Sequence, residues 1–166
     1  MKIAQPNLVP VQLDPGITPA DAGYADVVWR ILGHTYYLKA DSANAFAFET
    51  FDPPGTYVPP HVHPTQDEFI YVLENRFDLY LDGQHHVARK GELVRMPAGI
   101  PHGYYNISDT ATRAIFWVAP GRRLRELFDT LHDMTDPAQV VAESAKREVM
   151  FLRPEEYAFD MLALNK

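Results

Sequence analysis

Residues 55–68 read Gly55-Thr-Tyr-Val-Pro-Pro-His61-Val-His63-Pro-Thr-Gln-Asp-Glu68, and they bring two histidines and a carboxylate close together. Because side chains two apart on an extended strand point to the same face, His61 and His63 are predicted to share one face. Glu68 has the opposite parity, so it joins that face only if the chain turns before it. Pro64-Thr-Gln-Asp67 predicts such a turn, since proline fixes its own φ angle and lacks a hydrogen-bond donor.

A second stretch supplies a third histidine in a similar setting. It reads Gly91-Glu-Leu-Val-Arg-Met-Pro97-Ala-Gly99-Ile-Pro-His102-Gly-Tyr-Tyr-Asn106. The segment from Pro97 to Pro101 predicts a turn, and His102 then opens the following strand. Three imidazoles and one carboxylate around one interior form a mixed nitrogen and oxygen donor set, which suits a divalent transition metal. The predicted cofactor is therefore one ion of iron, manganese, nickel, cobalt, copper or zinc.

Both stretches resemble the paired signature motifs of the cupin superfamily. The positions that match the first motif are Gly55, His61, His63 and Glu68, and those that match the second are Gly91, Pro97, Gly99, His102 and Asn106. Asn75 stands where the first motif ends in glycine, and asparagine is the non-glycine residue that best tolerates a left-handed backbone conformation. The chain is similar to small single-domain cupins of the bacterial quercetin dioxygenase type, and the motif resemblance covers residues 43–119.

The resemblance implies an all-β fold, the double-stranded β-helix or jelly-roll barrel, to which we expect C-terminal α-helices to be added. The predicted organisation is an N-terminal arm with the first strands (1–42), a cupin barrel (43–119) and a helical extension packed on the barrel (120–166). Within the barrel, alternation and turn signals predict strands over 45–51, 69–73, 76–81, 84–89, 93–96, 103–107 and 113–118.

The last region changes to a helical period. A helix is predicted over 122–134, with an apolar face of Leu124, Leu127, Phe128, Leu131 and Met134. Asp136 and Pro137 have the residue types of an N-cap and a first helical position, so a second helix is expected to start there. Its predicted apolar side consists of Val140, Val141, Ala145 and Val149. Two such helices closing one end of a barrel would restrict access to a metal inside it.

The first residues form an arm that is too rich in proline for a helix. Its prolines are Pro6, Pro10, Pro15 and Pro19, and its apolar residues are Leu8, Val9, Val11 and Leu13. We expect residues 1–14 to add an edge strand to a sheet of the same chain or of a partner. The resemblance to small cupins points to a homodimer, and whether the arm is exchanged between subunits stays open.

Composition favours one compact unit and excludes several partners. The chain has 166 residues and a formal net charge of −7, which argues against nucleic acid or an anionic membrane as the main partner. It has no cysteine, so a disulfide framework and a thiolate-ligated metal are both excluded. The start lacks the apolar run of a signal peptide and no stretch approaches a membrane span, so the expected location is the cytoplasm.

The other four histidines match neither motif. His85 and His86 follow Asp82-Gly83, a hairpin-turn signal, and are predicted to be exposed. His34 follows a glycine in another apparent turn, and His132 falls in the helical stretch. None of them is predicted to belong to the site.

The predicted substrate pocket combines residues placed by parity with Glu68 or His102 and further aromatic residues: Ile70, Val72, Tyr104, Asn106, Phe48, Tyr57 and Phe116. Such a lining favours a planar or apolar organic substrate over a sugar or a phosphate. A substrate with an acidic enol or phenol would bind the metal as its anion, with Glu68 as general base.

Three functions are compatible with this site. The resemblance favours a metal-dependent dioxygenase that cleaves a flavonol-like or other enolic aromatic substrate with O2. A non-oxidative metalloenzyme (an isomerase, cyclase, lyase or decarboxylase) would use the same ligands. A ligand-binding barrel without turnover is the third, because this fold hosts many functions.

Overall fold

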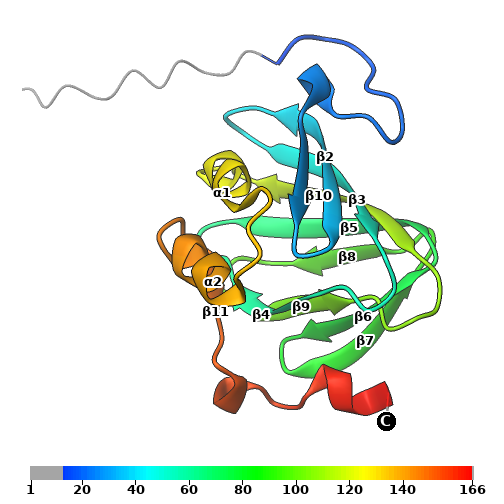
Figure 1. Ribbon diagram of the computed structural model, residues 1–166, viewed down its shortest axis with the longest axis vertical. Helices are drawn as coiled ribbons and strands as arrows, with labels where there is room; N and C mark the ends of the chain where they lie inside the picture. Colours follow the sequence, from blue (N-terminus) through cyan, green and yellow to red (C-terminus); the bar gives the residue numbers. More distant parts are fainter. Residues whose placement is uncertain (1–12, 166) are drawn as a thin grey trace, which may run out of the picture.

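Two antiparallel sheets form the body of the protein in the computed structural model, which describes residues 13–165 (Figure 1). The strands are β1 (Val28–Ile31), β2 (His34–Asp41), β3 (Phe46–Asp52), β4 (Tyr57–Val62), β5 (Asp67–Glu74), β6 (Arg76–Leu81), β7 (Gln84–Arg89), β8 (Leu93–Met96), β9 (His102–Tyr105), β10 (Thr112–Ala119) and β11 (Met150–Phe151). One sheet has the order β1-β2-β3-β10-β5-β8 and the other has the order β11-β4-β9-β6-β7. The predicted all-β jelly roll is confirmed.

The two α-helices follow β10 in the chain and lie on one side of the sheets (Figure 1). They are α1 (Leu124–Leu131) and α2 (Pro137–Ala145), and short 3-10 turns occur at η1 (Tyr24–Asp26), η2 (Pro154–Glu156) and η3 (Met161–Asn165). No helix within residues 13–165 is long and apolar enough to cross a membrane.

Strand prediction succeeded where alternation is strong and failed where proline interrupts it. The predicted strands 76–81, 84–89 and 93–96 coincide with β6, β7 and β8, and the other four are shifted by one or two residues at their ends. Four observed strands, β1, β2, β4 and β11, have no counterpart among these seven, although β1 and β2 lie within residues 1–42, where the first strands were expected. In β4, Pro59 and Pro60 lower the strand signal, but they fall in the irregular part of the β4–β9 pairing, between Val58 and His61, where the missing donors are tolerated.

Aromatic side chains fill the space between the sheets. Phe46, Phe77 and Phe116 are completely buried, and the Phe48 ring stacks on the Phe116 ring with centroids 5.2 Å apart. Phe48 on β3 and Phe116 on β10 are Cα partners in neighbouring strands, so this stack follows directly from the register. The core thus supports the strands that carry the site.

The two helices confirm the predicted helical region and correct one of its faces. In α1, Leu124, Leu127 and Leu131 are buried as predicted. In α2, the predicted N-cap is confirmed because Asp136 accepts a hydrogen bond from the Ala138 N–H at 2.9 Å. The predicted apolar side of α2 was wrong in part: Val141 and Ala145 are exposed, and Ser144 is buried beside Val140. Val140 and Ser144 are four residues apart, so they lie on the same face of the helix, and this is the face that is buried.

Parts of the prediction fall outside what the structure describes. Leu8, Val9 and Val11 of the arm lie outside the described residues, and Leu13 is 40% exposed. The edge-strand role of the arm, the homodimer and the three-part division of the chain stay predictions. Strands β1 and β2, from the first of the three regions, nevertheless extend the same sheet as β3.

Asn75 shows why the first motif tolerates a residue other than glycine. It lies between β5 and β6 with a φ of 60°, the left-handed conformation that was predicted. Its amide Nδ2 donates to Ser108 Oγ at 2.7 Å and lies 3.0 Å from Thr112 Oγ1. The side chain therefore ties the β5–β6 turn to the segment before β10, which glycine would not do.

Replacing Asn75 separates these two contributions. Asn75→Gly keeps the backbone conformation and loses the amide hydrogen bonds, so the free energy of unfolding should fall by about 1–2 kcal/mol. Asn75→Ala should lose about 1 kcal/mol more, because alanine is strained at positive φ. Urea unfolding measures both. Asp82→Gly is the matched control, since Asp82 has a φ of 49° and no side-chain hydrogen bond within residues 13–165; equal stability of Asn75→Gly and the wild type would contradict this account.

Candidate metal centre

The four predicted ligands come from three strands of two sheets. His61 lies on β4 and His63 directly after it, Glu68 lies on β5, and His102 is the first residue of β9. The turn predicted after His63 is present at residues 64–65, and the turn predicted after Pro97 ends where His102 begins β9. His61 and His102 are Cα partners in the β4–β9 pairing, so the register itself brings their rings together.

These four side chains converge in the interior. One donor atom from each lies within 4.8 Å of all the others, and all four residues are buried. The Glu68 Oε2 atom is 2.9 Å from His102 Nε2 and 3.4 Å from His63 Nε2. The His61 and His102 ring centroids are 4.5 Å apart. The convergence has the form of a ligand set, with every donor atom facing one point.

Hydrogen bonds fix the tautomer of each imidazole. His61 Nδ1 donates to the Pro59 carbonyl at 2.9 Å, and His102 Nδ1 donates to the Ile100 carbonyl at 2.9 Å. A carbonyl oxygen only accepts, so the proton of each ring must be on Nδ1. The Nε2 atoms are thereby left to face the centre with their lone pairs, as metal-ligating histidines require.

Gln66 fixes the third ring in the same way. Its Nε2 donates to the Pro120 carbonyl at 2.8 Å and to the Gly121 carbonyl at 2.9 Å, so its Oε1 is the atom left to accept. That oxygen lies 3.1 Å from His63 Nδ1 and takes the proton there. Gln66 is 2% exposed and belongs to the first motif stretch, yet its residue type alone did not mark it as part of the site.

Electrostatics within the cluster depend on burial and on mutual proximity. Burial, followed by the charges of His102 and His63, holds the pKa of His61 well below its ordinary value. Burial also acts to raise the pKa of Glu68, but His63, His102 and His61 together outweigh it and lower that pKa to about 2. Glu68 is therefore ionised at neutral pH, and its negative charge is compensated by positive charge at the surrounding imidazole nitrogens or by a bound cation.

The donor set fits a divalent transition metal. Since His102 Nδ1 already carries a proton, the 2.9 Å contact between His102 Nε2 and Glu68 is favourable only with a positive charge at Nε2, either a second proton or a metal ion. The ligand types, the fixed tautomers and the burial all match the requirements of a three-histidine, one-carboxylate site.

A cavity of about 480 Å³ opens from this centre toward the helices. His61, His63 and Glu68 form part of its wall. The rest is mostly apolar and comes from both sheets and from the helical region, including Phe48, Leu124, Leu127, Phe128, Val140 and Phe151. Among the lining residues that the structure describes, none is lysine or arginine. The helices of the C-terminal region thus form one wall of the cavity, as expected from their apolar faces.

The predicted pocket residues divide into two groups. Phe48, Tyr57 and Tyr104 line the cavity. Ile70 and Val72 face inward as parity predicts, but they and Phe116, a candidate whose facing the sequence left open, are fully buried in the core and are not among the lining residues. Asn106 is also buried, and its Nδ2 donates to the carbonyls of Asp52 and Thr110, each at 2.8 Å. That side chain holds the segment after β9 in place.

The structure adds a histidine to the cavity wall that the sequence did not predict. His34 is 2% exposed at the start of β2, directly after a turn at residues 32–33, and it was not predicted to belong to the site. Its Nδ1 lies 2.5 Å from Asp52 Oδ1, whose other oxygen accepts a hydrogen bond from Thr50 at 2.5 Å. These partners lie on β3, so only the pairing of β2 with β3 identifies the cluster. His85 and His86 are exposed as predicted, and His132 follows the last residue of α1.

Comparison with known proteins shows which family model and which proteins are similar to this chain. Residues 48–118 match the family model described as "Cupin domain". Protein SchB of Streptomyces halstedii is 34% identical over 92 residues, which are 54% of this chain and 67% of that protein. Polyketide synthase CurC of Streptomyces cyaneus is 33% identical over 67 residues, 40% of this chain and 44% of that protein.

A third relative is a dioxygenase. Quercetin 2,3-dioxygenase of Bacillus subtilis is 31% identical over 85 residues, which are 51% of this chain and 25% of that protein. The chain thus spans less than half of CurC and a quarter of the dioxygenase. Among solved structures, an RmlC-like cupin from Shewanella frigidimarina matches with a TM-score of 0.59 and 19% identity over 69% of this chain and 98% of that chain. At that identity the likeness concerns the fold.

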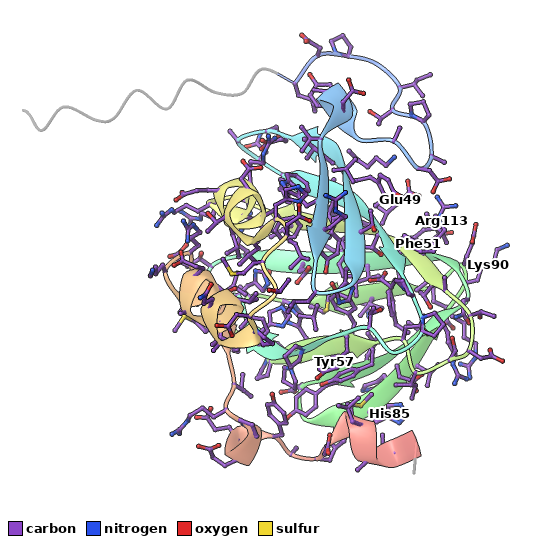
Figure 2. The ribbon with its side chains drawn as sticks, viewed as in Figure 1. Glu49, Phe51, Tyr57, His85, Lys90 and Arg113 are labelled. Carbon is purple, nitrogen blue, oxygen red and sulfur yellow. The ribbon has the colours of Figure 1, made fainter. Side chains whose placement is uncertain are left out.

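Loss of one ligand is expected to empty the centre. His102→Ala removes an Nε2 donor and should lower the metal content from about one ion per chain to a small fraction after dialysis, because the remaining groups chelate less well. Elemental analysis measures this directly. His85→Ala is the control, since His85 is exposed on β7 and lies low in the view of Figure 2. Full metal content in His102→Ala would remove this residue from the ligand set.

Proposed function

The chain belongs to the cupin family, and on that premise we propose that it is a metal-dependent dioxygenase that cleaves a flavonol-like or other enolic aromatic substrate with O2. The observation that carries the proposal is that the converging donor atoms of the candidate metal centre open onto an apolar cavity of about 480 Å³ without a cationic side chain in its described lining. Such a cavity suits a planar, weakly acidic molecule better than a phosphate or a sugar. The similarity to quercetin 2,3-dioxygenase supports the same substrate class.

The metal is part of the proposal. Iron, manganese, nickel, cobalt, copper or zinc, held by His61, His63, Glu68 and His102, would act as a Lewis acid that acidifies the enolic hydroxyl of the substrate. The chain contributes the preorganisation of its ligands, since the Nδ1 protons of the rings are already committed to the carbonyls of Pro59 and Ile100 and to Gln66.

Glu68 is the proposed proton acceptor. Its pKa of about 2 keeps it ionised at neutral pH, so its Oε2 atom accepts the enolic proton rather than donating one. Removal of that proton makes the enolate carbon electron-rich. O2 is then the oxidant: both of its atoms enter the product, and the carbon–carbon bond of the former enol breaks.

The apolar walls hold the substrate and exclude water. Phe48 and Phe128, with ring centroids 4.9 Å apart, offer flat apolar surface to an aromatic ring. Leu127 of α1 adds to the same wall. Exclusion of water by this lining strengthens the electrostatic interactions inside and protects reactive species from hydrolysis.

A second candidate is a non-oxidative reaction at the same site. The similarity over 67 residues to a protein named polyketide synthase favours it, because polyketides carry the same enolic and phenolic oxygens. Abstraction of a proton by Glu68 without participation of O2 would then lead to isomerisation, cyclisation or elimination. The two candidates share the ligands and the base and differ only in whether O2 is consumed.

Oxygen consumption distinguishes the two reactions. The metal-loaded protein, mixed with quercetin in an oxygen electrode, should consume one O2 per substrate converted, with loss of the flavonol absorbance. Metal-free protein is the control. Conversion of substrate under nitrogen, at the same rate as in air, would contradict the dioxygenase and favour the non-oxidative enzyme.

Replacement of Glu68 tests the proton acceptor separately. Glu68→Gln keeps the three imidazole ligands, so it should retain most of the metal and lose about 10²–10⁴-fold in rate. Glu74→Gln is the matched control, because Glu74 lies on the same strand, with a side chain that is 58% exposed. Turnover and metal content are measured on the same samples. Undiminished turnover by Glu68→Gln would exclude this residue as the base.

A further inference from the structure

Two tyrosine hydroxyls meet in the wall of the cavity that also contains His61, His63 and Glu68. Tyr36 comes from β2 in the six-stranded sheet, and Tyr104 comes from β9 in the five-stranded sheet. Their hydroxyl oxygens are 2.9 Å apart, and the two residues are 4% and 6% exposed. Both line the same cavity as His61, His63 and Glu68. This hydroxyl pair bridges the two sheets in a cavity whose lining is mostly apolar.

The hydroxyl pair has more hydrogen-bonding capacity than it uses. Two hydroxyls carry two protons, and the single bond between them consumes one. Within residues 13–165, neither hydroxyl makes a second hydrogen bond. One O–H donor and several acceptor lone pairs are therefore available to a group in the cavity, in a region where an unused polar group is costly.

Surrounding residues hold the pair rigidly. The Tyr36 ring stacks on the His34 ring, with centroids 5.5 Å apart and an angle of 9° between the planes. His34 is in turn fixed by Asp52, at 2.5 Å. Burial, followed by the charge of Asp52, raises the pKa of Tyr36 well above its ordinary value. The Tyr36 hydroxyl thus keeps its proton at neutral pH and remains a hydrogen-bond donor.

We propose that the Tyr36–Tyr104 hydroxyl pair is a second substrate-binding point, which takes a phenol or ketone oxygen remote from the enol at the metal centre. The ligand class is a planar aromatic molecule with oxygen atoms at two separate places, such as a polyhydroxylated flavonol. This inference rests on the proposed function, because it assumes that the enol lies at the metal centre. The two tyrosines are positioning residues, since they orient the substrate without taking part in bond making.

The apolar wall explains why two polar points give orientation. Phe48, Leu127 and Phe128 line the cavity, and their side chains offer no hydrogen bond to a substrate. A planar molecule bound only at the metal would be free to turn over within such a wall. A second hydrogen bond selects one of the possible orientations, and it excludes molecules that lack the matching oxygen.

The test compares two probes that differ only in the remote oxygens. Quercetin and the parent flavonol share the enolic hydroxyl and its adjacent carbonyl, and the parent lacks the other hydroxyls. Dissociation constants are measured by calorimetry under nitrogen on metal-loaded wild type, Tyr36→Phe and Tyr104→Phe. Tyr71→Phe is the control, because Tyr71 is 42% exposed.

Wild type and Tyr71→Phe should bind quercetin about tenfold more tightly than the parent flavonol, as expected for one net hydrogen bond. Tyr36→Phe and Tyr104→Phe should lose this preference and keep the affinity for the parent flavonol. A purely structural role would weaken the binding of both probes equally, and that result would overturn the inference. Absence of any preference in wild type, or of any binding, would overturn it as well.

The outcome is separable from that of the proposed function. If the preference disappears in the variants while wild type consumes no O2, the hydroxyl pair binds substrate and the dioxygenase proposal fails. If wild type consumes O2 and the variants keep the preference, the dioxygenase proposal stands and the hydroxyl pair has no role in substrate binding.

Discussion

Glu68 is buried among three imidazoles, and the negative charge of its carboxylate must be compensated inside the protein. An ionised carboxylate in an apolar interior costs several kcal/mol unless a positive charge compensates it. In this protein the compensation is concentrated at one point, where His63 and His102 lie within 3.4 Å of the carboxylate. A divalent ion at that point would replace the protons that the rings must otherwise carry. Binding of such an ion would then also stabilise the folded state.

Local spacing was sufficient to predict which four side chains converge, but it was not sufficient to predict the residues that line the cavity. His61, His63 and Glu68 are set by strand parity and one turn, and both are readable over a few residues. The alternation of a strand predicts which face of the sheet a side chain points to, but not how far along the barrel it lies. Ile70 and Val72 therefore face inward but pack in the core and do not line the cavity. His34 and Tyr36 were missed for a different reason. Their partners, Asp52 and Tyr104, lie 18 and 68 positions away in the sequence, and only the pairing of strands brings them together.

The C-terminal region is more closely tied to the site than a covering layer would be. β11 pairs with β4, and Phe151 is the Cα partner of His61. The Phe151 ring lies 5.2 Å from the His61 ring. This pairing covers the edge of the strand that carries two of the ligands, where open backbone groups would invite other strands. Since α1 and α2 also supply part of the cavity wall, their apolar faces serve the barrel and the site together. Val140, Val141 and Ser144 of α2 line the cavity, although Val141 is 43% exposed.

The arrangement of polar groups restricts the chemistry of the ligand further than the fold does. Polar atoms of the cavity lining include those of the candidate metal centre, the Tyr36–Tyr104 hydroxyl pair and His34, and most of the remaining wall is aromatic or aliphatic. A phosphate would find no cation among the described lining residues, and a sugar would leave most of its hydroxyls without partners against that wall. A flat aromatic molecule leaves neither an unpaired charge nor many unpaired hydroxyls against the wall, because its two faces are apolar and its oxygens are attached to the edge of the ring. The same reasoning explains how one barrel could serve oxidative and non-oxidative reactions. In the proposed function, the walls would select and orient an enolic aromatic, and the fate of its enolate would then depend on whether O2 or a proton reaches the carbon first.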